Sequence, residues 1–332
     1  SGAAPDATEQ AAHAQVARTR APALVGARVL ALPLVGDERL LGALVLRDPP
    51  APIEGDRRRA LEALAARAGV ALEHAVLFTN QTEIARRLQE RLLPLTPPPV
   101  PGLDIAVAYR SASPGVERGG DFIDFFSQTD GHLAVAIGDV AGKGVGAVAT
   151  TVAVKYALRA AVRGGSLSWP VRPGAVLQEL HNSLLGELDA ERFVTVLFAT
   201  VGVRRGTMQL ATAGHPAPFV VRASGAERPM LLTAPAIGID RDAALVPYPT
   251  ETVDLDPGDL VVLFTDGIAE ARDGSGALFE DAMPEVLADL RGRPAGEAVE
   301  AVLEAARRFA AGPLTDDIAV VCLRLAEAPG AA

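Results

Sequence analysis

The sequence contains very little cysteine or lysine. Cys322 is the single cysteine among 332 residues, so no disulfide can form within the chain, which argues against a disulfide-stapled secreted domain. Lys143 and Lys155 are the only lysines, and arginine supplies the other basic side chains, a usage typical of translated GC-rich bacterial genomes. The predicted location is therefore the reducing cytoplasm of a bacterium.

The chain also lacks a long, uninterrupted apolar run. The most apolar stretch, Val145 to Val162, is interrupted by Lys155 and Arg159 and falls short of the ~20 apolar residues of a membrane span. Residues 1–20 are rich in alanine and glutamine and lack the basic-then-apolar order of a signal peptide. Neither a transmembrane helix nor membrane binding is predicted.

Positive charge is in short supply as well. The formal net charge is −10 at pH 7, whereas proteins that bind nucleic acid need clustered lysine and arginine. Nucleic acid is therefore not an expected partner. The composition, 49% apolar and 22% charged, is that of a folded globular protein, and the length suits one large domain and a smaller one.

The first part of the chain has the pattern of a hairpin followed by a long helix. Two apolar runs between residues 28 and 46, separated by the polar turn Gly36-Asp37, predict a pair of strands. From residue 54 to 90 apolar side chains recur at spacings of three and four, which predicts one amphipathic helix. A proline-rich segment at 94–101 ends this helix and marks a domain boundary.

The remainder alternates strand-like runs, short turns and a few helices. Because neighbouring strands are joined by short turns, the pattern favours antiparallel sheets with helices packed outside them, an α/β sandwich. The expected strands are 104–109, 121–126, 133–137, 193–203, 208–213, 218–221, 260–264 and 318–325, and the expected helices are 146–162, 174–188, 282–290 and 296–310.

Acidic residues stand at the ends of several of these predicted strands. They occur in Gly119-Gly120-Asp121, at Asp124, and in Gly138-Asp139, Thr265-Asp266-Gly267 and Thr315-Asp316-Asp317. A single Asp-Gly is usually a turn or a helix cap. A set of carboxylates flanked by glycine, with little histidine or cysteine, instead favours a site for Mg²⁺ or Mn²⁺ over one for zinc. Two such ions can activate a water molecule for attack on a phosphoryl group.

The same segments resemble a known family. Gly119-Gly-Asp-Phe-Ile-Asp124, Gly138-Asp-Val-Ala-Gly-Lys-Gly144, Ala213-Gly-His-Pro216, Phe264-Thr-Asp-Gly267 with Glu270-Ala-Arg272, and Asp316-Asp-Ile318 are similar in order and spacing to the motifs of PPM-type phosphatases. The resemblance is strongest to the bacterial SpoIIE/RsbU branch and covers nearly all of residues 95–326. It implies an αββα sandwich of two antiparallel sheets flanked by helices. It also implies a metal-dependent serine/threonine protein phosphatase acting on phosphorylated anti-sigma-factor antagonist (STAS) proteins.

The resemblance further implies a role for each carboxylate. Asp139 would bridge two ions, either Mn²⁺ or Mg²⁺, with the carbonyl of Val140 assisting. Asp266 and Asp316 would complete the ligands of one ion, and Asp121 would serve the other. The same four aspartates form the predicted catalytic set. Asp124 and Asp317 would act from behind the ligands by orienting water or ligand side chains.

The sequence departs from the family pattern at three positions. Ala141 stands where eukaryotic relatives have a histidine thought to protonate the leaving group, so the general acid is not assigned. Ile123 replaces the usual aromatic residue, and Ala319 replaces a common threonine. These departures keep a second hypothesis open, a catalytically weak protein-binding regulator that retains the fold.

Four other residues have alternative interpretations. We favour a role in turn or loop packing for His215 over a catalytic one. Arg110 and Arg118 suit phosphate recognition by chemistry, but solvated surface positions are preferred. For Lys143 the sequence does not choose between a functional role and stabilisation of its loop. The segment around Lys143 is not a P-loop, because it is one residue too short before Gly-Lys and has no serine or threonine after it.

The predicted organisation has five parts. Residues 1–27 form an N-terminal tail, 28–78 a hairpin and helix that resemble the last half of a GAF domain, 79–94 a helical linker, 95–326 the phosphatase domain, and 327–332 a C-terminal tail. An ordinary accessory unit is an equally good interpretation of the hairpin and helix. The helix over 54–93 is also a candidate for homodimerisation, because part of its apolar series keeps coiled-coil spacing: Leu61, Leu64, Ala68, Ala71, Ala75 and Phe78. Packing of the same stripe on its own hairpin is an equally good interpretation. A second stripe at Ile84, Leu88 and Leu92 follows.

Overall fold

The computed structural model describes most of the chain. The described residues are 6–26, 28–37, 39–49, 53–92, 96–110, 120–128, 131–142, 145–163, 171–186, 188, 192–239, 247–314 and 316–326, with the backbone alone at 77–92, 127, 128 and 145. They form two compact units, Ser1–Glu83 and Ile84–Ala332. The division falls inside the segment predicted to be a linker.

The first unit is a small antiparallel sheet covered by a helix on each face. Its elements are α1 (Ala7–Thr19), β1 (Ala23–Val25), β2 (Val29–Val35), β3 (Leu40–Arg47) and the beginning of α2 (Gly55–Leu92), with strand order β1-β2-β3. Side chains alternate along β2 as they must in a strand. Val29 and Ala31 pack on the face covered by α1, whereas Leu30 and Leu32 pack on the face with Ala65 of α2.

The predicted N-terminal tail is wrong for residues 7–25. The carboxylate of Asp6 accepts from the N–H of Glu9 while the carboxylate of Glu9 accepts from the N–H of Asp6, a capping box that starts α1. Ala12 and Val16 of this helix are buried against the sheet. The alanine-rich sequence has few large apolar side chains, so its buried face produces only a weak helical pattern.

The predicted hairpin and the helix after it are confirmed, but the helix divides its apolar residues between two faces. Leu61 and Ala65 pack against the sheet, and Gly69 lies so close to Val35 that a Cβ there would overlap the Val35 backbone. Leu64, in contrast, is 56% exposed, and Ala71 is exposed as well. The side chains of Phe78, Ile84, Leu88 and Leu92 lie outside the described set.

No described helix has a stretch both long and apolar enough to cross a bilayer.

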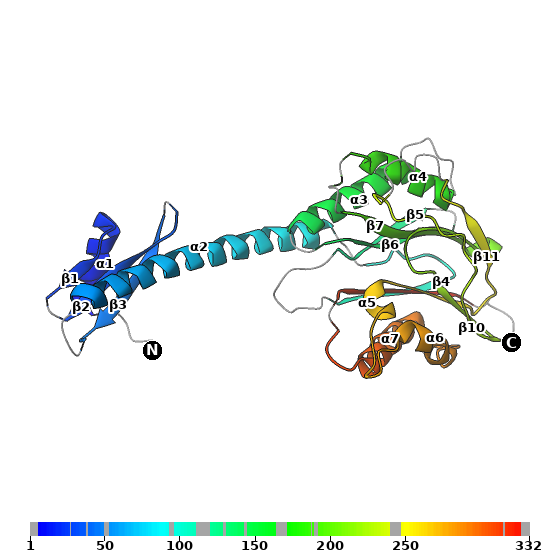
Figure 1. Cartoon of the computed structure of the whole chain (residues 1–332). Coiled ribbons are helices and arrows are strands. Elements are labelled where there is room, and N and C mark those ends of the chain that lie inside the picture. The colour runs from blue at the N-terminus through cyan, green and yellow to red at the C-terminus, as the bar shows by residue number, and fades with distance from the viewer. Residues whose placement is uncertain are drawn as a thin grey trace. The chain divides into compact units, whose positions relative to one another are not determined.

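The second unit confirms the predicted αββα sandwich (Figure 1). Within the described residues, one antiparallel sheet has the order β11-β8-β7-β6-β5 and the other the order β10-β9-β12-β13-β4. The strands are β4 (Leu103–Arg110), β5 (Phe122–Gln128), β6 (His132–Val140), β7 (Val194–Gly202), β8 (Thr207–Ala213), β9 (Phe219–Arg222), β10 (Gly225–Glu227), β11 (Glu251–Asp254), β12 (Leu260–Phe264) and β13 (Ile318–Leu325). The helices are α3 (Val145–Arg163), α4 (Pro173–Leu184), α5 (Asp266–Ala269), α6 (Phe279–Ala288) and α7 (Ala295–Phe309), and a 3₁₀ turn spans Val203–Arg205.

Three apolar layers hold this unit together. α3 and α4 cover the outer face of the first sheet, and α6 and α7 cover the outer face of the second (Figure 1). Between the two sheets, alternate residues such as Leu133, Val135 and Ile137 of β6 pack against Val321 and Leu323 of β13. Ala134, Ala136 and Val140 of β6 face α3 and α4 instead, and every residue from 133 to 138 is buried.

In the second unit the expected strands and long helices are all present, but β10, β11, α5 and the 3₁₀ turn were not predicted. β10, β11 and α5 have only three or four residues each, too few to show a period.

Cys322 lies on β13, fully buried, and burial raises the pKa of its thiol above the usual range.

Candidate metal centre

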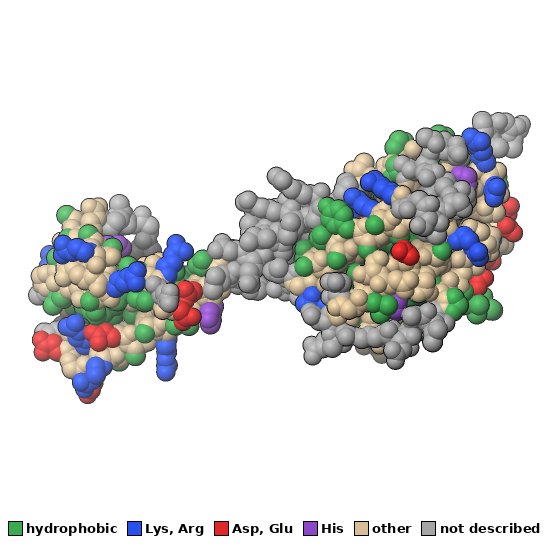
Figure 2. Space-filling view, turned by 90° about the horizontal axis from the view of Figure 1, so that it is seen from above, with side chains coloured by type: hydrophobic (Ala, Val, Ile, Leu, Met, Phe, Trp, Pro, Cys, Tyr) green, Lys and Arg blue, Asp and Glu red, His purple; other side chains and the backbone are tan. Residues whose placement is uncertain are grey.

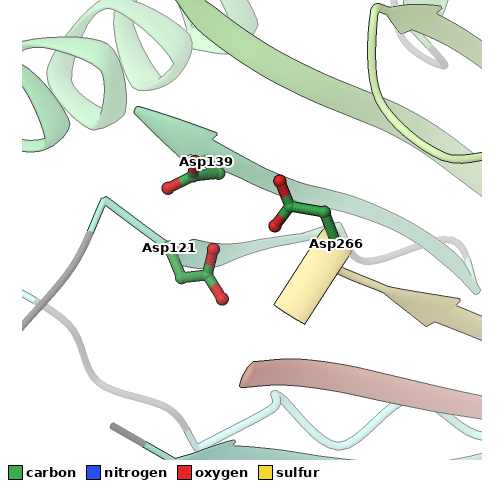
Figure 3. A group of neighbouring side chains, drawn as sticks. All are labelled: Asp121, Asp139 and Asp266. Carbon is green, nitrogen blue, oxygen red and sulfur yellow. The ribbon is translucent and has the colours of Figure 1, made fainter. Parts of the chain in front are cut away.

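Three carboxylates from separate segments meet at one end of the sandwich. Asp139 lies near the end of β6, Asp121 immediately before β5, and Asp266 at the first position of α5. One oxygen from each can be chosen such that all three atoms lie within 4.8 Å of one another. Figure 3 shows the three side chains gathered from these three elements.

Two glycines permit this close approach. β5 and β6 pair with Phe122 opposite Gly138, which places Asp121 beside the strand that carries Asp139. A Cβ on Gly120 would overlap the carbonyl oxygen of Val140 and crowd the carboxylate of Asp139. A Cβ on Gly267 would overlap the carbonyl oxygen of Asp317. Only glycine therefore lets these backbones come as near as the site requires.

Burial and mutual repulsion make the charged forms of these carboxylates unfavourable. Burial, followed by the charges of Asp266 and Asp316, raises the pKa of Asp139 to about 7. The pKa of Asp121 is also raised, chiefly by burial and then by Asp139, and that of Asp266 by burial and then by Asp316. Within the described part of the chain no arginine or lysine forms an ion pair with Asp121, Asp139 or Asp266. This is the electrostatic arrangement that a divalent cation relieves.

Thr265 links the centre to the second sheet. Its hydroxyl donates to a carboxylate oxygen of Asp121 at 2.7 Å and accepts from the N–H of Ala319 at 2.9 Å. Its own N–H donates to the carbonyl of Ala319 at 3.1 Å. Thr265 is fully buried, so its hydroxyl fixes one oxygen of Asp121 and leaves the other oxygen for a different partner. Thr265 belongs to the Thr265-Asp266-Gly267 motif but is not one of the predicted site residues.

Asp316 lies at the margin of the group. It is not among the three carboxylates that meet within 4.8 Å, but its charge raises the pKa of both Asp139 and Asp266. With Asp266 and Glu270 it lines a cavity of about 350 Å³ beside the carboxylates. The four predicted ligands are therefore neighbours, with Asp316 on the cavity side.

Asp124 and Asp317 are turned toward other partners. Asp124 accepts two hydrogen bonds from the guanidinium of Arg159, at 2.8 and 3.0 Å, and lies 3.9 Å from the ammonium of Lys155. Its predicted place behind the metal ligands is therefore taken up by an ion pair with α3. The carboxylate of Asp317 accepts from the hydroxyl of Tyr109, while its charge still acts on Asp121 and Asp139.

His215 joins the two sheets and has a packing role, as expected. One ring nitrogen lies 3.1 Å from the Thr195 hydroxyl on β7 and the other 3.1 Å from the Phe264 carbonyl on β12. Burial lowers its pKa to about 3, so the ring is neutral at pH 7. Arg110 binds its neighbour's carbonyl and lies 3.6 Å from Glu300 at the surface, which agrees with the solvated interpretation. Arg118 and Lys143 lie outside the described residues.

Comparison with known proteins identifies the family. The sequence profile described as "Stage II sporulation protein E (SpoIIE)" matches residues 129–326, which is more than half of the chain. The chain belongs to the SpoIIE family. This membership and the acidic centre establish a metal-dependent serine/threonine protein phosphatase of the PPM type.

Individual relatives of this SpoIIE-family chain agree with that assignment. It is 26% identical over 246 residues to the phosphoserine phosphatase RsbU of Bacillus subtilis, covering 74% of this chain and 70% of RsbU. It is 23% identical to the phosphoserine phosphatase RsbP of the same organism, covering 58% of this chain but 45% of RsbP. The SiaA-PP2C domain of Pseudomonas aeruginosa has the same fold, with a TM-score of 0.61 and 23% identity over 77% of this chain and 99% of that domain. The resemblance of residues 28–78 to a GAF domain stays a prediction.

Proposed function

We propose that this phosphatase hydrolyses phosphoserine or phosphothreonine with water activated by two divalent cations, Mn²⁺ or Mg²⁺. The observation that carries the proposal is the group of buried carboxylates of Asp121, Asp139 and Asp266, which no described cation balances. Two bound ions would supply a water molecule of lowered pKa and positive charge for the phosphoryl oxygens.

The residues present fit such ions. Hard cations of this size prefer carboxylate and carbonyl oxygens, and the centre offers both without any nitrogen or sulfur ligand among its three grouped side chains. The raised pKa of each carboxylate also follows from negative charge held close together in a buried place, which bound cations would offset.

Each residue has a distinct task in this proposal. Asp139 and the carbonyl of Val140 would hold both ions. Asp266 and Asp316 would help to hold one of them, and Asp121 would help to hold the other, with its orientation set by the hydrogen bond from Thr265. Ala141 has no proton to donate, so protonation of the leaving alkoxide falls to water or to another group.

The substrate we propose is a phosphorylated STAS-type protein involved in sigma-factor regulation. Support comes from the named activity of RsbU and RsbP as phosphoserine phosphatases. Figure 2 shows basic, acidic and apolar side chains interspersed on the visible face of the second unit. Such a mixed surface suits a protein partner better than a polyanion.

The test measures release of phosphate from phosphorylated STAS proteins with increasing Mn²⁺, using the whole chain. Asp139→Asn is expected to lower turnover by more than about a hundredfold, because it removes a charge that both ions share. Asp281→Asn, on the exposed side of α6, serves as the matched control and is expected to behave as wild type. Near-normal turnover by Asp139→Asn would refute the mechanism. Absence of turnover by the wild-type chain on every phosphoprotein would favour the binding regulator.

We also propose that α2 forms a homodimer through its exposed stripe and thereby regulates the phosphatase. Leu64 is 56% exposed although it belongs to the coiled-coil series, so the sheet does not account for it. Leu64→Glu is expected to convert a dimer to a monomer in sedimentation and to change phosphatase activity. Leu24→Glu, at an equally exposed position on β1, is the control. A wild-type chain that stays monomeric at micromolar concentration, with activity unchanged by Leu64→Glu, would contradict this proposal.

A further inference from the structure

The inner face of α3 carries three polar side chains in one row. Thr151, Lys155 and Arg159 follow one another at intervals of four residues, so they lie on the same side of the helix. Lys155 is only 3% exposed, which is unusual for a lysine, and Thr151 is buried as well. Neither the metal centre nor the apolar core of the unit accounts for this row.

All three side chains reach the short segment from Gly120 to Asp124. The hydroxyl of Thr151 donates to two carbonyl oxygens, that of Gly120 at 3.3 Å and that of Ala147 at 3.0 Å. The ammonium of Lys155 donates to the carbonyl of Ile123 at 2.8 Å. Arg159 holds the carboxylate of Asp124 with two hydrogen bonds. Asp121 lies in the middle of the segment that these groups bind.

The position of β5 explains why it needs such contacts. β5 is the last strand in its sheet order, with β6 as its neighbour on one side. An edge strand leaves alternate carbonyl groups without a partner in the sheet, and a buried one must find a donor elsewhere. The side chain of Lys155 supplies that donor at Ile123, two residues beyond Asp121.

Burying a lysine is unfavourable unless its charge is matched, and here a buried carboxylate offsets part of the cost. Asp124 lies 3.9 Å from the ammonium and is itself only 3% exposed. A mobile contact would not compensate for the loss of hydration of both groups. The arrangement therefore requires α3 and the Gly120–Asp124 segment to keep a fixed distance.

We infer that Lys155, supported by Thr151 and Arg159, is a positioning residue that holds Asp121 at the metal centre. This inference rests on the proposed function, because it assumes that Asp121 binds an ion. Lys155 does not touch the reacting atoms. It acts through the backbone of the strand that begins beside Asp121, from the opposite side to the hydroxyl of Thr265.

The main test replaces Lys155 with methionine, which keeps the length of the side chain and removes the donor. Mn²⁺ binding is measured by calorimetry on the whole chain, and phosphatase activity is measured against Mn²⁺ concentration. Lys155→Met is expected to raise the Mn²⁺ dissociation constant and the half-saturating Mn²⁺ concentration about tenfold, in the range seen when groups that orient metal ligands are lost. Turnover at saturating Mn²⁺ is expected to change by less than about threefold, because Lys155 does not touch the reacting atoms.

Val154→Ala is the matched control, since Val154 is fully buried on the same helix and faces the apolar core. It is expected to lower the thermal midpoint and leave Mn²⁺ binding unchanged. If Lys155→Met does not fold, Thr151→Val and Thr151→Ser test the inference instead, because valine lacks the hydroxyl and serine keeps it. Weaker Mn²⁺ binding in the valine variant, restored in the serine variant, supports the inference.

The outcome that overturns the inference is distinct from failure of the proposed function. If folded Lys155→Met binds Mn²⁺ as tightly as wild type, the row only stabilises the helix. If Lys155→Met does not fold, wild-type Mn²⁺ affinity in both Thr151 variants leads to the same conclusion. Wild-type Mn²⁺ binding and turnover in Asp139→Asn would instead remove the two-ion mechanism itself.

Discussion

Asp121 and Asp124 are three residues apart and almost equally buried, yet they face opposite electrostatic surroundings. Asp121 is 2% exposed and faces Asp139 and Asp266, and among the described residues it has one neutral hydrogen-bond donor, Thr265. Asp124 is 3% exposed and faces Arg159 and Lys155. One carboxylate is left among like charges and the other is matched by cations.

The difference between the surroundings of these two carboxylates distinguishes an arrangement that stabilises the fold from one that serves function. A buried carboxylate matched by a guanidinium and an ammonium fastens a helix to a strand. Buried carboxylates left together are unfavourable for the fold alone and are retained where a ligand will supply the opposite charge. The segment from Gly120 to Asp124 thus carries one acid matched by cations and one that, in the proposed function, binds a metal ion.

The largest expected effect comes from removing the matched charge. Asp124→Asn leaves the ammonium of Lys155 buried without a carboxylate, which is expected to lower the free energy of unfolding by about 3 kcal/mol. Asp121→Asn removes a repelled charge, so in the absence of metal at pH 8 it is expected to leave stability unchanged or to increase it. Urea unfolding of both variants checks this, and a similar loss in the two would break the comparison.

A smaller effect is expected at the hydroxyl that orients Asp121. Thr265→Val keeps the shape but removes a donor to Asp121 and an acceptor for the N–H of Ala319, which is expected to cost about 2 kcal/mol. Mn²⁺ affinity is expected to fall as well, because one carboxylate oxygen loses its orientation. Thr265→Ser keeps the hydroxyl and should retain most of the Mn²⁺ affinity in calorimetry. Equal Mn²⁺ affinities in the two variants would show that Thr265 does not orient Asp121.

The smallest expected effect is the dependence of stability on pH. The pKa of Asp139 is raised from 3.8 to about 7, so the metal-free folded state binds this proton more tightly than the unfolded state does. The metal-free protein therefore loses stability as pH rises from about 4 to about 7. Protons compete with Mn²⁺ in the same range, so the increase in thermal midpoint on adding Mn²⁺ should be small at pH 5 and full at pH 8. An increase that does not vary between these pH values would contradict the assignment of Asp139.

Much of the fold follows from sequence pattern because its strands are long and end at glycine and aspartate. The short apolar run of β6 and the spacing of three and four along α7 are both clear from the residues alone. The helix α1 was missed because a face made of alanine and one valine carries little hydrophobic contrast. Its burial depends on the sheet that it covers, which local sequence does not show.

The acidic centre was predicted in outline, and the face on which Asp124 lies could have been predicted as well. Asp121 and Asp124 differ by three positions, and side chains three apart in an extended strand point to opposite faces. That rule alone separates Asp124 from the metal centre. The partner of Lys155 was not predictable in the same way, because the contact joins residues 32 positions apart and depends on how α3 packs.

The buried cysteine offers an independent view of this molecule. Because Cys322 sits inside β13 with its thiol fully covered and its pKa raised, an alkylating reagent reaches it only when the sheet opens. No second thiol competes for the reagent in this sequence. The rate of alkylation therefore measures how often the sheet that carries Thr265 opens. This measurement needs no substrate, no metal and no substitution.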